Sequence, residues 1–196
     1  MYKPSLEEIK KLREETLASI AHCKDALEQS EGKYEEALKL IQKRGQAKAA
    51  DKATRVAAAG IIDSYIHNGK QVGVLLDLRC ETDFVGRNEE FAKLSHDICL
   101  QIAATNPQWV SSVNVPADIL EQKKAEWKQE FINQGKKGDV VDKALEGKVK
   151  TFYKETCLLD QPFIRDESKT VKDAIDAAVG KIGENIRVKA FTRYSI

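Results

Sequence analysis

The sequence predicts an α+β protein in which helices come first and a small antiparallel sheet follows. Three observations carry this prediction. Apolar residues recur at helical spacing between start and stop signals over residues 5–45. Apolar and polar residues alternate on both sides of an Asn68-Gly69 pair, which predicts a β-hairpin. The alternation returns at the end of the chain, over residues 186–194, and predicts a third strand.

The first 45 residues predict three short helices, and therefore a helical domain over residues 1–45. Ser5-Leu6-Glu7-Glu8 has the form of a capping box and opens the first helix. Thr16 is the expected cap of the second, which carries Leu17 and Ile20. Gly32 breaks the chain before the third helix, and Lys43-Arg44-Gly45, basic residues before a glycine, is the expected end of that helix.

A linking helix and the hairpin are expected next. Residues 46–59 are rich in Ala and carry little apolar mass, which favours a linking helix that ends at Gly60. Ile61–His67 is the first strand, and Asn68-Gly69 predicts a type I′ turn. The second strand, over residues 71–80, places these residues on its buried side: Val72, Val74, Leu76, Leu78 and Cys80.

Helices are expected to cover the sheet of this core and dimerisation domain, residues 60–196. One begins at Asn88, an N-cap, and runs to Asn106-Pro107. A helical insertion occupies about 117–160 and turns at Gly135–Gly138. A last helix, from a capping box at Thr170 to Gly183, leads into the terminal strand. In that strand Ile186, Val188, Ala190, Thr192 and Tyr194 are expected on one face, and Arg187, Lys189, Phe191 and Arg193 on the other.

The connection between the second strand and the helix after it contains a large aromatic residue, Phe84, beside the carboxylate of Asp83. Two interpretations stay open. In the first, Phe84 folds back onto the core below the connection, as most aromatic residues of small domains do. In the second, Phe84 enters a pocket of a partner protein while Asp83 hydrogen-bonds beside it, the usual composition of an interface hot spot.

Composition and motifs favour a binding protein over an enzyme. The net charge of +1 gives no overall field to attract a polyanion or a membrane surface. Four scattered cysteines favour a reducing compartment, and with no membrane-spanning run or leader the expected location is the cytoplasm. The sequence lacks a phosphate-binding glycine loop and the common hydrolase motifs. His22, His67 and His96 share no ligand spacing, so we expect neither a metal nor a cofactor.

Three motifs together resemble the bacterial elongation factor Ts family. Cys80–Val85, followed by Asn88–Phe91, resembles the family signature. Lys39–Gly45, leading into Lys48-Ala49-Ala50, resembles the linker after the N-terminal domain of the family. Lys181–Ile186 resembles its C-terminal motif. The resemblance covers nearly the whole chain in the family's order, and 196 residues match the short bacterial form.

The resemblance implies a ubiquitin-associated-like (UBA-like) N-terminal bundle and a guanine-nucleotide exchange factor for elongation factor Tu. It implies that Thr82, Asp83, Phe84 and Val85 enter the GTPase and dislodge its Mg²⁺. It also implies a homodimer, because a lone three-stranded sheet leaves one face and its edges to protect.

The N-terminal contact of the family is expected to be altered in this chain. Arg13, Ile20 and Ala21 occupy the family's contact positions. Between the first two helices the chain reads Thr16-Leu17-Ala18-Ser19-Ile20-Ala21-His22-Cys23-Lys24, whereas the family usually has Thr-Gly-Ala-Gly, two apolar residues and then Asp-Cys-Lys. Glycines in such a turn permit backbone shapes that Leu17 and Ser19 resist.

Two other functions stay open from the residues alone. A helical adaptor would bind peptide or ubiquitin-like partners through the N-terminal bundle. An RNA-binding protein would use the basic residues of the terminal strand, although one aromatic is few for an RNA-recognition sheet.

Overall fold

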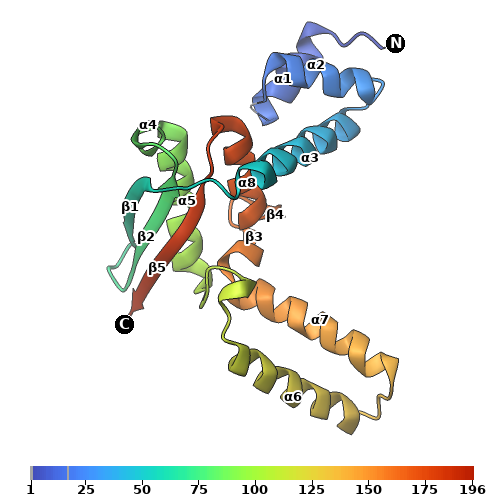
Figure 1. Cartoon of the computed structure of the whole chain (residues 1–196), viewed down its shortest axis with the longest axis vertical. Coiled ribbons are helices and arrows are strands. Elements are labelled where there is room, and N and C mark those ends of the chain that lie inside the picture. The colour runs from blue at the N-terminus through green and yellow to red at the C-terminus, as the bar shows by residue number, and fades with distance from the viewer. Residues whose placement is uncertain (1, 17) are drawn as a thin grey trace. The chain divides into compact units, whose positions relative to one another are not determined.

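The computed structural model describes residues 2–16 and 18–196 of the chain, and its fold is α+β as predicted (Figure 1). Its residues form two compact units, and each unit is made of three separate segments of the chain. The first unit contains Met1–Ile61, Leu78–Leu94 and Asp173–Arg187. The second unit contains Ile62–Asp77, Ser95–Lys172 and Val188–Ile196.

Three helices open the first unit: α1 (Leu6–Thr16), α2 (Ile20–Gln29) and α3 (Tyr34–Lys52). The predicted capping box is present, because the Glu8 N–H donates to Ser5 Oγ at 3.2 Å and the Ser5 N–H donates to Glu8 Oε2 at 2.7 Å. The helices enclose a small apolar cluster formed by Ile9, Leu12, Cys23, Ala26, Leu27 and Ala37. The prediction of three N-terminal helices is therefore confirmed.

The cap predicted for α2 was wrong. Ser19 is the N-cap, and its hydroxyl accepts the His22 N–H at 3.2 Å. The Thr16 hydroxyl instead donates to the Leu12 carbonyl at 2.6 Å, within α1. A Thr hydroxyl often bonds back to the preceding turn when its residue is still helical, which explains the difference. Leu17, which was expected on α2, lies outside the described residues.

The predicted end of the third helix at Gly45 was also wrong. Helix α3 continues through Gly45 to Lys52, and Arg44 pairs with Asp25 of α2 at 2.6 Å rather than capping a helix end. Residues expected to form a separate linking helix up to Ala59 are helical only as far as Lys52, and Ala59 begins the first strand. The division of the chain into domains at residues 45 and 59 stays a prediction.

The main sheet has three strands, β1 (Ala59–Ile66), β2 (Val72–Cys80) and β5 (Arg187–Ser195), in the order β1-β2-β5. Neighbouring strands run in opposite directions (Figure 1). The hairpin is confirmed, but its turn is not type I′, because positive φ falls on Gly69 (92°) and Lys70 (57°) rather than on Asn68. The His67 N–H donates to the Val72 carbonyl at 2.8 Å, which leaves four residues in the loop instead of two.

The predicted faces of the strands hold for β2 but only in part for β5. In β2, Val74, Leu76, Leu78 and Cys80 are buried, as expected. In β5, Val188 is buried, but farther along Phe191 and Arg193 are half-buried while Thr192 and Tyr194 are exposed. The Arg193 guanidinium donates to the Ala103 carbonyl at 3.2 Å. The alternation thus shifts by one residue within β5, which the sequence pattern did not reveal.

The remaining elements are mostly helical. They are α4 (Asp83–Gly86), α5 (Glu89–Thr105), α6 (Ala117–Asn133), α7 (Asp139–Thr156) and α8 (Val171–Ile182). Helices α6 and α7 form an antiparallel pair in the second unit (Figure 1), with the rings of Trp127 and Phe152 5.7 Å apart. A second sheet of β3 (Pro162–Phe163) and β4 (Asp166–Thr170) was not predicted, because strands this short leave little pattern. No helix in the described part of the chain has the length and apolarity that a membrane crossing requires.

Candidate partner-binding site

The connection predicted after the second strand is a single helical turn held between two regular elements. Strand β2 ends at the buried Cys80, Thr82 is the N-cap, and α4 follows as Asp83–Gly86. The Asn88 N–H donates to the Val85 carbonyl at 2.9 Å, and Asn88 Oδ1 accepts the Glu90 N–H at 2.8 Å. Asn88 thus closes this turn and opens α5, as its position in the sequence predicted.

Phe84 lies on the outside of this turn, with 82% of its surface exposed. The interpretation in which Phe84 packs onto the core was therefore wrong, because a side chain this exposed has almost no neighbours to pack against. Asp83 pairs with Arg87 one turn later, at 3.3 Å, and both side chains are mostly exposed. Val85 is half-buried. The segment thus presents an aromatic ring and a carboxylate to solvent side by side.

A carboxylate from a distant part of the chain holds the entrance to the turn. Glu184 Oε2 accepts the N–H groups of Glu81 at 3.1 Å and Thr82 at 3.0 Å, and Glu184 Oε1 accepts the Thr82 hydroxyl at 2.7 Å. In return, Glu81 Oε1 accepts the Asn185 N–H at 2.7 Å. Sequence reasoning missed Glu184 as a neighbour of the segment, since a separation of 102 residues leaves no periodic signal.

The thiol beside this turn is not a reactive one. This thiol, of Cys80, is buried and donates to the Thr82 carbonyl at 3.1 Å. Burial raises the pKa of the Cys80 thiol, and the negative charge of Glu184 raises it further. The thiol therefore stays neutral near pH 7 and is a poor nucleophile. The described residues also contain no group of three or more His, Cys, Asp or Glu side chains placed to hold a metal ion.

The other predicted contact residues lie on the N-terminal helices. Arg13 is on α1, and Ile20 and Ala21 begin α2. All three are exposed, and 58% of the surface of Ile20 faces solvent. They lie on other elements of the same unit than the Thr82–Val85 turn.

A helical N-terminal part, an α+β core and an exposed aromatic on a braced turn are the features of a factor that binds a partner protein. The sequence model of the family described as Elongation factor TS matches residues 3–196. The chain is 45% identical over 190 residues to elongation factor Ts of Thermoanaerobacter sp. (strain X514), and this alignment covers 97% of this chain and 93% of the relative. It is 44% identical over 192 residues to elongation factor Ts of Fervidobacterium nodosum, and this alignment covers 98% of each of the two chains.

The elongation factor Ts of Desulforamulus reducens is 44% identical over 196 residues, covering 100% of this chain and 90% of the relative. The chain therefore belongs to the elongation factor Ts family. Membership implies a nucleotide exchange factor for elongation factor Tu in translation elongation, rather than a catalyst of a covalent reaction.

Proposed function

We propose that this chain accelerates GDP release from elongation factor Tu by inserting the Thr82–Val85 turn beside the Mg²⁺ of the GTPase and dislodging that ion. The observation that carries the proposal is the exposure of Phe84, 82%, on a turn fixed at both ends. The GDP and the Mg²⁺ belong to the partner. This chain supplies the aromatic ring, the neighbouring Asp83 carboxylate and a rigid support.

Packing explains how an inserted ring displaces an ion. Protein interiors are close-packed, so the GTPase cannot admit the ring of Phe84 without moving its own elements. If the moved elements position the Mg²⁺ ligands, binding of this chain weakens Mg²⁺ and nucleotide together. By thermodynamic reciprocity, nucleotide then weakens binding of this chain by the same factor. Each tenfold loss of GDP affinity takes about 1.4 kcal/mol of differential contact.

Asp83 has a separate role in the proposal. In the free chain its carboxylate pairs with Arg87 at 3.3 Å on the surface, where such pairs contribute little free energy. The Asp83 carboxylate is therefore available to accept hydrogen bonds from the GTPase next to the inserted ring. Arg13, Ile20 and Ala21 supply a second contact, and their exposure supports this assignment.

The test is the release of a fluorescent GDP from purified elongation factor Tu, with and without this chain, across a Mg²⁺ titration. We expect acceleration at low Mg²⁺ that fades as Mg²⁺ rises, because the ion and the inserted turn compete. Acceleration that does not depend on Mg²⁺ would reject ion displacement. Absence of acceleration by the folded chain would reject the exchange function itself.

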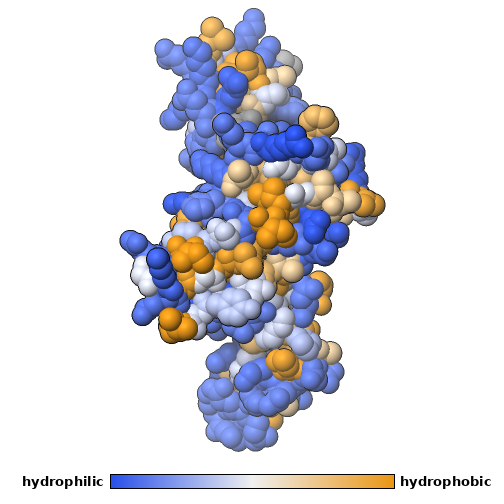
Figure 2. All heavy atoms as spheres, turned by 90° about the vertical axis from the view of Figure 1, so that its left-hand side faces the viewer, coloured by the Kyte–Doolittle hydropathy of each residue, from blue (hydrophilic) through white to orange (hydrophobic). Residues whose placement is uncertain are grey.

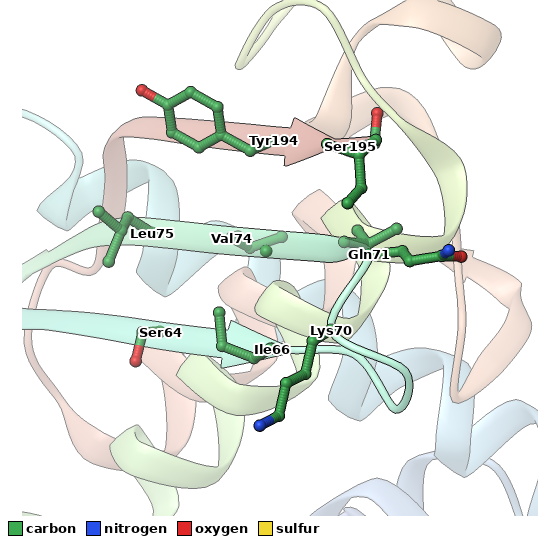
Figure 3. Close-up of a pocket in the computed structure, with 11 residues that line it drawn as sticks. Ser64, Ile66, Lys70, Gln71, Val74, Leu75, Tyr194 and Ser195 are labelled. Atoms are coloured by element: carbon green, nitrogen blue, oxygen red, sulfur yellow. The ribbon is translucent and has the colours of Figure 1, made fainter.

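We also propose that the chain forms a homodimer through the uncovered face of the sheet in the second unit. A shallow groove there is lined by residues of all three strands, among them Ile66, Leu75 and Tyr194 (Figure 3). These three side chains are 61%, 51% and 73% exposed. Apolar side chains gather on this side of the molecule (Figure 2), and exposed apolar patches of this kind mark interaction sites.

The proposal assigns no nucleic acid as a direct partner. The basic residues of β5 that an RNA would need are partly engaged within the second unit. Arg193 donates to the Ala103 carbonyl at 3.2 Å, and Lys189 lies 4.0 Å from the Asp77 carboxylate. A basic row whose one aromatic, Phe191, is half-buried is a weak RNA surface.

A further inference from the structure

The turn that carries Phe84 has few contacts of its own to hold its shape. Helix α4 has four residues, and an isolated helical turn of this length is unstable in water. Its N-cap residue, Thr82, makes no side-chain cap bond to the turn, because its hydroxyl donates to Glu184 instead. Phe84 adds no packing, since it faces solvent. The direction of the ring therefore depends on how the ends of the turn are held.

Residues on both sides of the turn are bonded to the C-terminal end of α8 and the residues that follow it. On the N-terminal side, Glu184 accepts three hydrogen bonds, from the N–H groups of Glu81 and Thr82 and from the Thr82 hydroxyl, at 2.7 to 3.1 Å. On the C-terminal side, Lys181 pairs with Glu90, in the first turn of α5, at 2.7 Å. The Lys181 ammonium bonded to Glu90 holds the pKa of that carboxyl below its usual value.

The brace formed by Glu184 is itself supported by buried contacts. Gly183, with φ of 88°, ends α8 and turns the chain so that Glu184 follows directly. The next residue, Asn185, is only 6% exposed, and its amide donates to the Arg55 carbonyl at 2.8 Å. Asn185 N–H also donates to the Glu81 carboxylate at 2.7 Å. Such mutually satisfied networks fix a single geometry.

We propose that Glu184 is a positioning residue, whose carboxylate holds Thr82 so that the following turn presents Phe84 to the GTPase in one orientation. The inference rests on the function proposed for the Thr82–Val85 turn. Glu184 acts through the turn: it places the groups that make the contact. A binding group held in place before encounter loses less conformational freedom on binding, so more of its contact energy is expressed.

The experiment compares Glu184→Ala and Glu184→Gln with a control, Val179→Ala, which removes buried apolar surface from α8 but no side chain that bonds to Glu81 or Thr82. Two quantities are measured. One is amide hydrogen exchange at Glu81 and Thr82 in the free protein, because both N–H groups donate to Glu184. The other is the maximal rate of GDP release from elongation factor Tu.

We expect Glu184→Ala to lose protection at both amides and to lower the maximal release rate about tenfold. Glu184→Gln should keep most of both, because its amide oxygen accepts the two N–H groups and its NH₂ donates to the Thr82 hydroxyl, which can also accept. Val179→Ala should lower the melting temperature yet keep the release rate. A rate that follows melting temperature across all three variants would overturn the proposal.

A double variant separates positioning from an independent contact. If Glu184 acts only through the turn, adding Glu184→Ala to Phe84→Ala should slow release no further than Phe84→Ala alone. Additive losses would overturn the assignment. Amide exchange is measured without the GTPase, so it tests whether Glu184 holds Glu81 and Thr82 independently of the release assay. If the native chain does not accelerate GDP release, the proposed function fails, but the exchange result still stands. The positioning role of Glu184 would also be overturned if Glu184→Ala left the protection of the two amides unchanged, or if it removed that protection without slowing GDP release.

Discussion

For Phe84, the free protein and the proposed complex with the GTPase favour opposite surroundings. Leaving an aromatic ring 82% in water forgoes the roughly 1.5–3 kcal/mol that burying a large apolar side chain contributes. The free chain gains nothing from this placement that Ala would not give. In a partner's pocket the same ring contributes its full apolar area. The bound state proposed above therefore accounts for the exposure of this side chain.

This contrast predicts the outcome of Phe84→Ala. Exchange efficiency should fall by about 2–4 kcal/mol, the range of a hot-spot truncation, while the melting temperature stays within a degree or so of the parent. Fluorescent GDP release and circular dichroism measure the two quantities. Val113→Ala is the matched control, because Val113 is also exposed, at 89%, but lies elsewhere, and it should change neither. A fall in melting temperature comparable to that of a core truncation would restore the packing role for Phe84.

Sequence reasoning reached this residue but could not settle its environment. The strand pattern and the Asn88 cap placed Phe84 correctly in a connection, and the family signature marked it as a contact residue. Neither states whether a ring turns inward, because that depends on contacts between distant segments. Glu184 shows the same limit, since its bonds to Glu81 and Thr82 join parts of the chain with no common periodicity.

Helix α3 continues through a sequence that usually ends a helix. Basic residues followed by Gly are a common helix end, yet Gly45 lies inside α3. A Cβ built on Gly180 of α8 would lie 3.2 Å from Gly45 Cα, so the two helices pass closely here. Gln46 donates to Asp173 at 2.9 Å, and Lys52 donates to the Gly183 carbonyl. These contacts with α8 stabilise the part of α3 beyond Gly45. The spacing of residues in the sequence does not show them.

A pair of glycine substitutions tests this arrangement. A Cβ at Gly45 meets nothing within 4 Å, so Gly45→Ala should raise the free energy of unfolding by about 1 kcal/mol through helix propensity alone. A Cβ at Gly180 meets the backbone of α3, which cannot move aside as a side chain does. The overpacking, about 1–3 kcal/mol, should cancel or exceed the same propensity gain, so Gly180→Ala should be the less stable variant.

Urea denaturation of both variants measures the difference between these unfolding free energies. The native chain is the reference, and the slopes must agree for the comparison to hold. If Gly45→Ala proves destabilising instead, the helix ends at Gly45 as the sequence pattern suggested. If Gly180→Ala is as stabilising as Gly45→Ala, the close approach of α3 and α8 is absent in solution.

For the whole molecule, the exposed apolar face of the sheet is the feature that calls for a partner. Ile66, Leu75 and Tyr194 are 61%, 51% and 73% exposed there, and the sheet has only three strands. A second copy of the chain is the partner that the geometry favours, because a twofold axis lets the same apolar patch cover itself. The chain's net charge of +1 gives little overall repulsion between two copies.

Light scattering at micromolar concentration distinguishes the monomer from the dimer. The native chain should have twice the 21.9 kDa mass of one copy. Leu75→Glu combined with Tyr194→Glu should give the single mass, because four carboxylates would face one another without partners across the twofold axis. Val113→Glu adds the same kind of charge at an exposed apolar site outside the sheet, and should leave the dimer intact. A native chain that is already monomeric contradicts the dimer, and a double variant that still dimerises places the interface elsewhere.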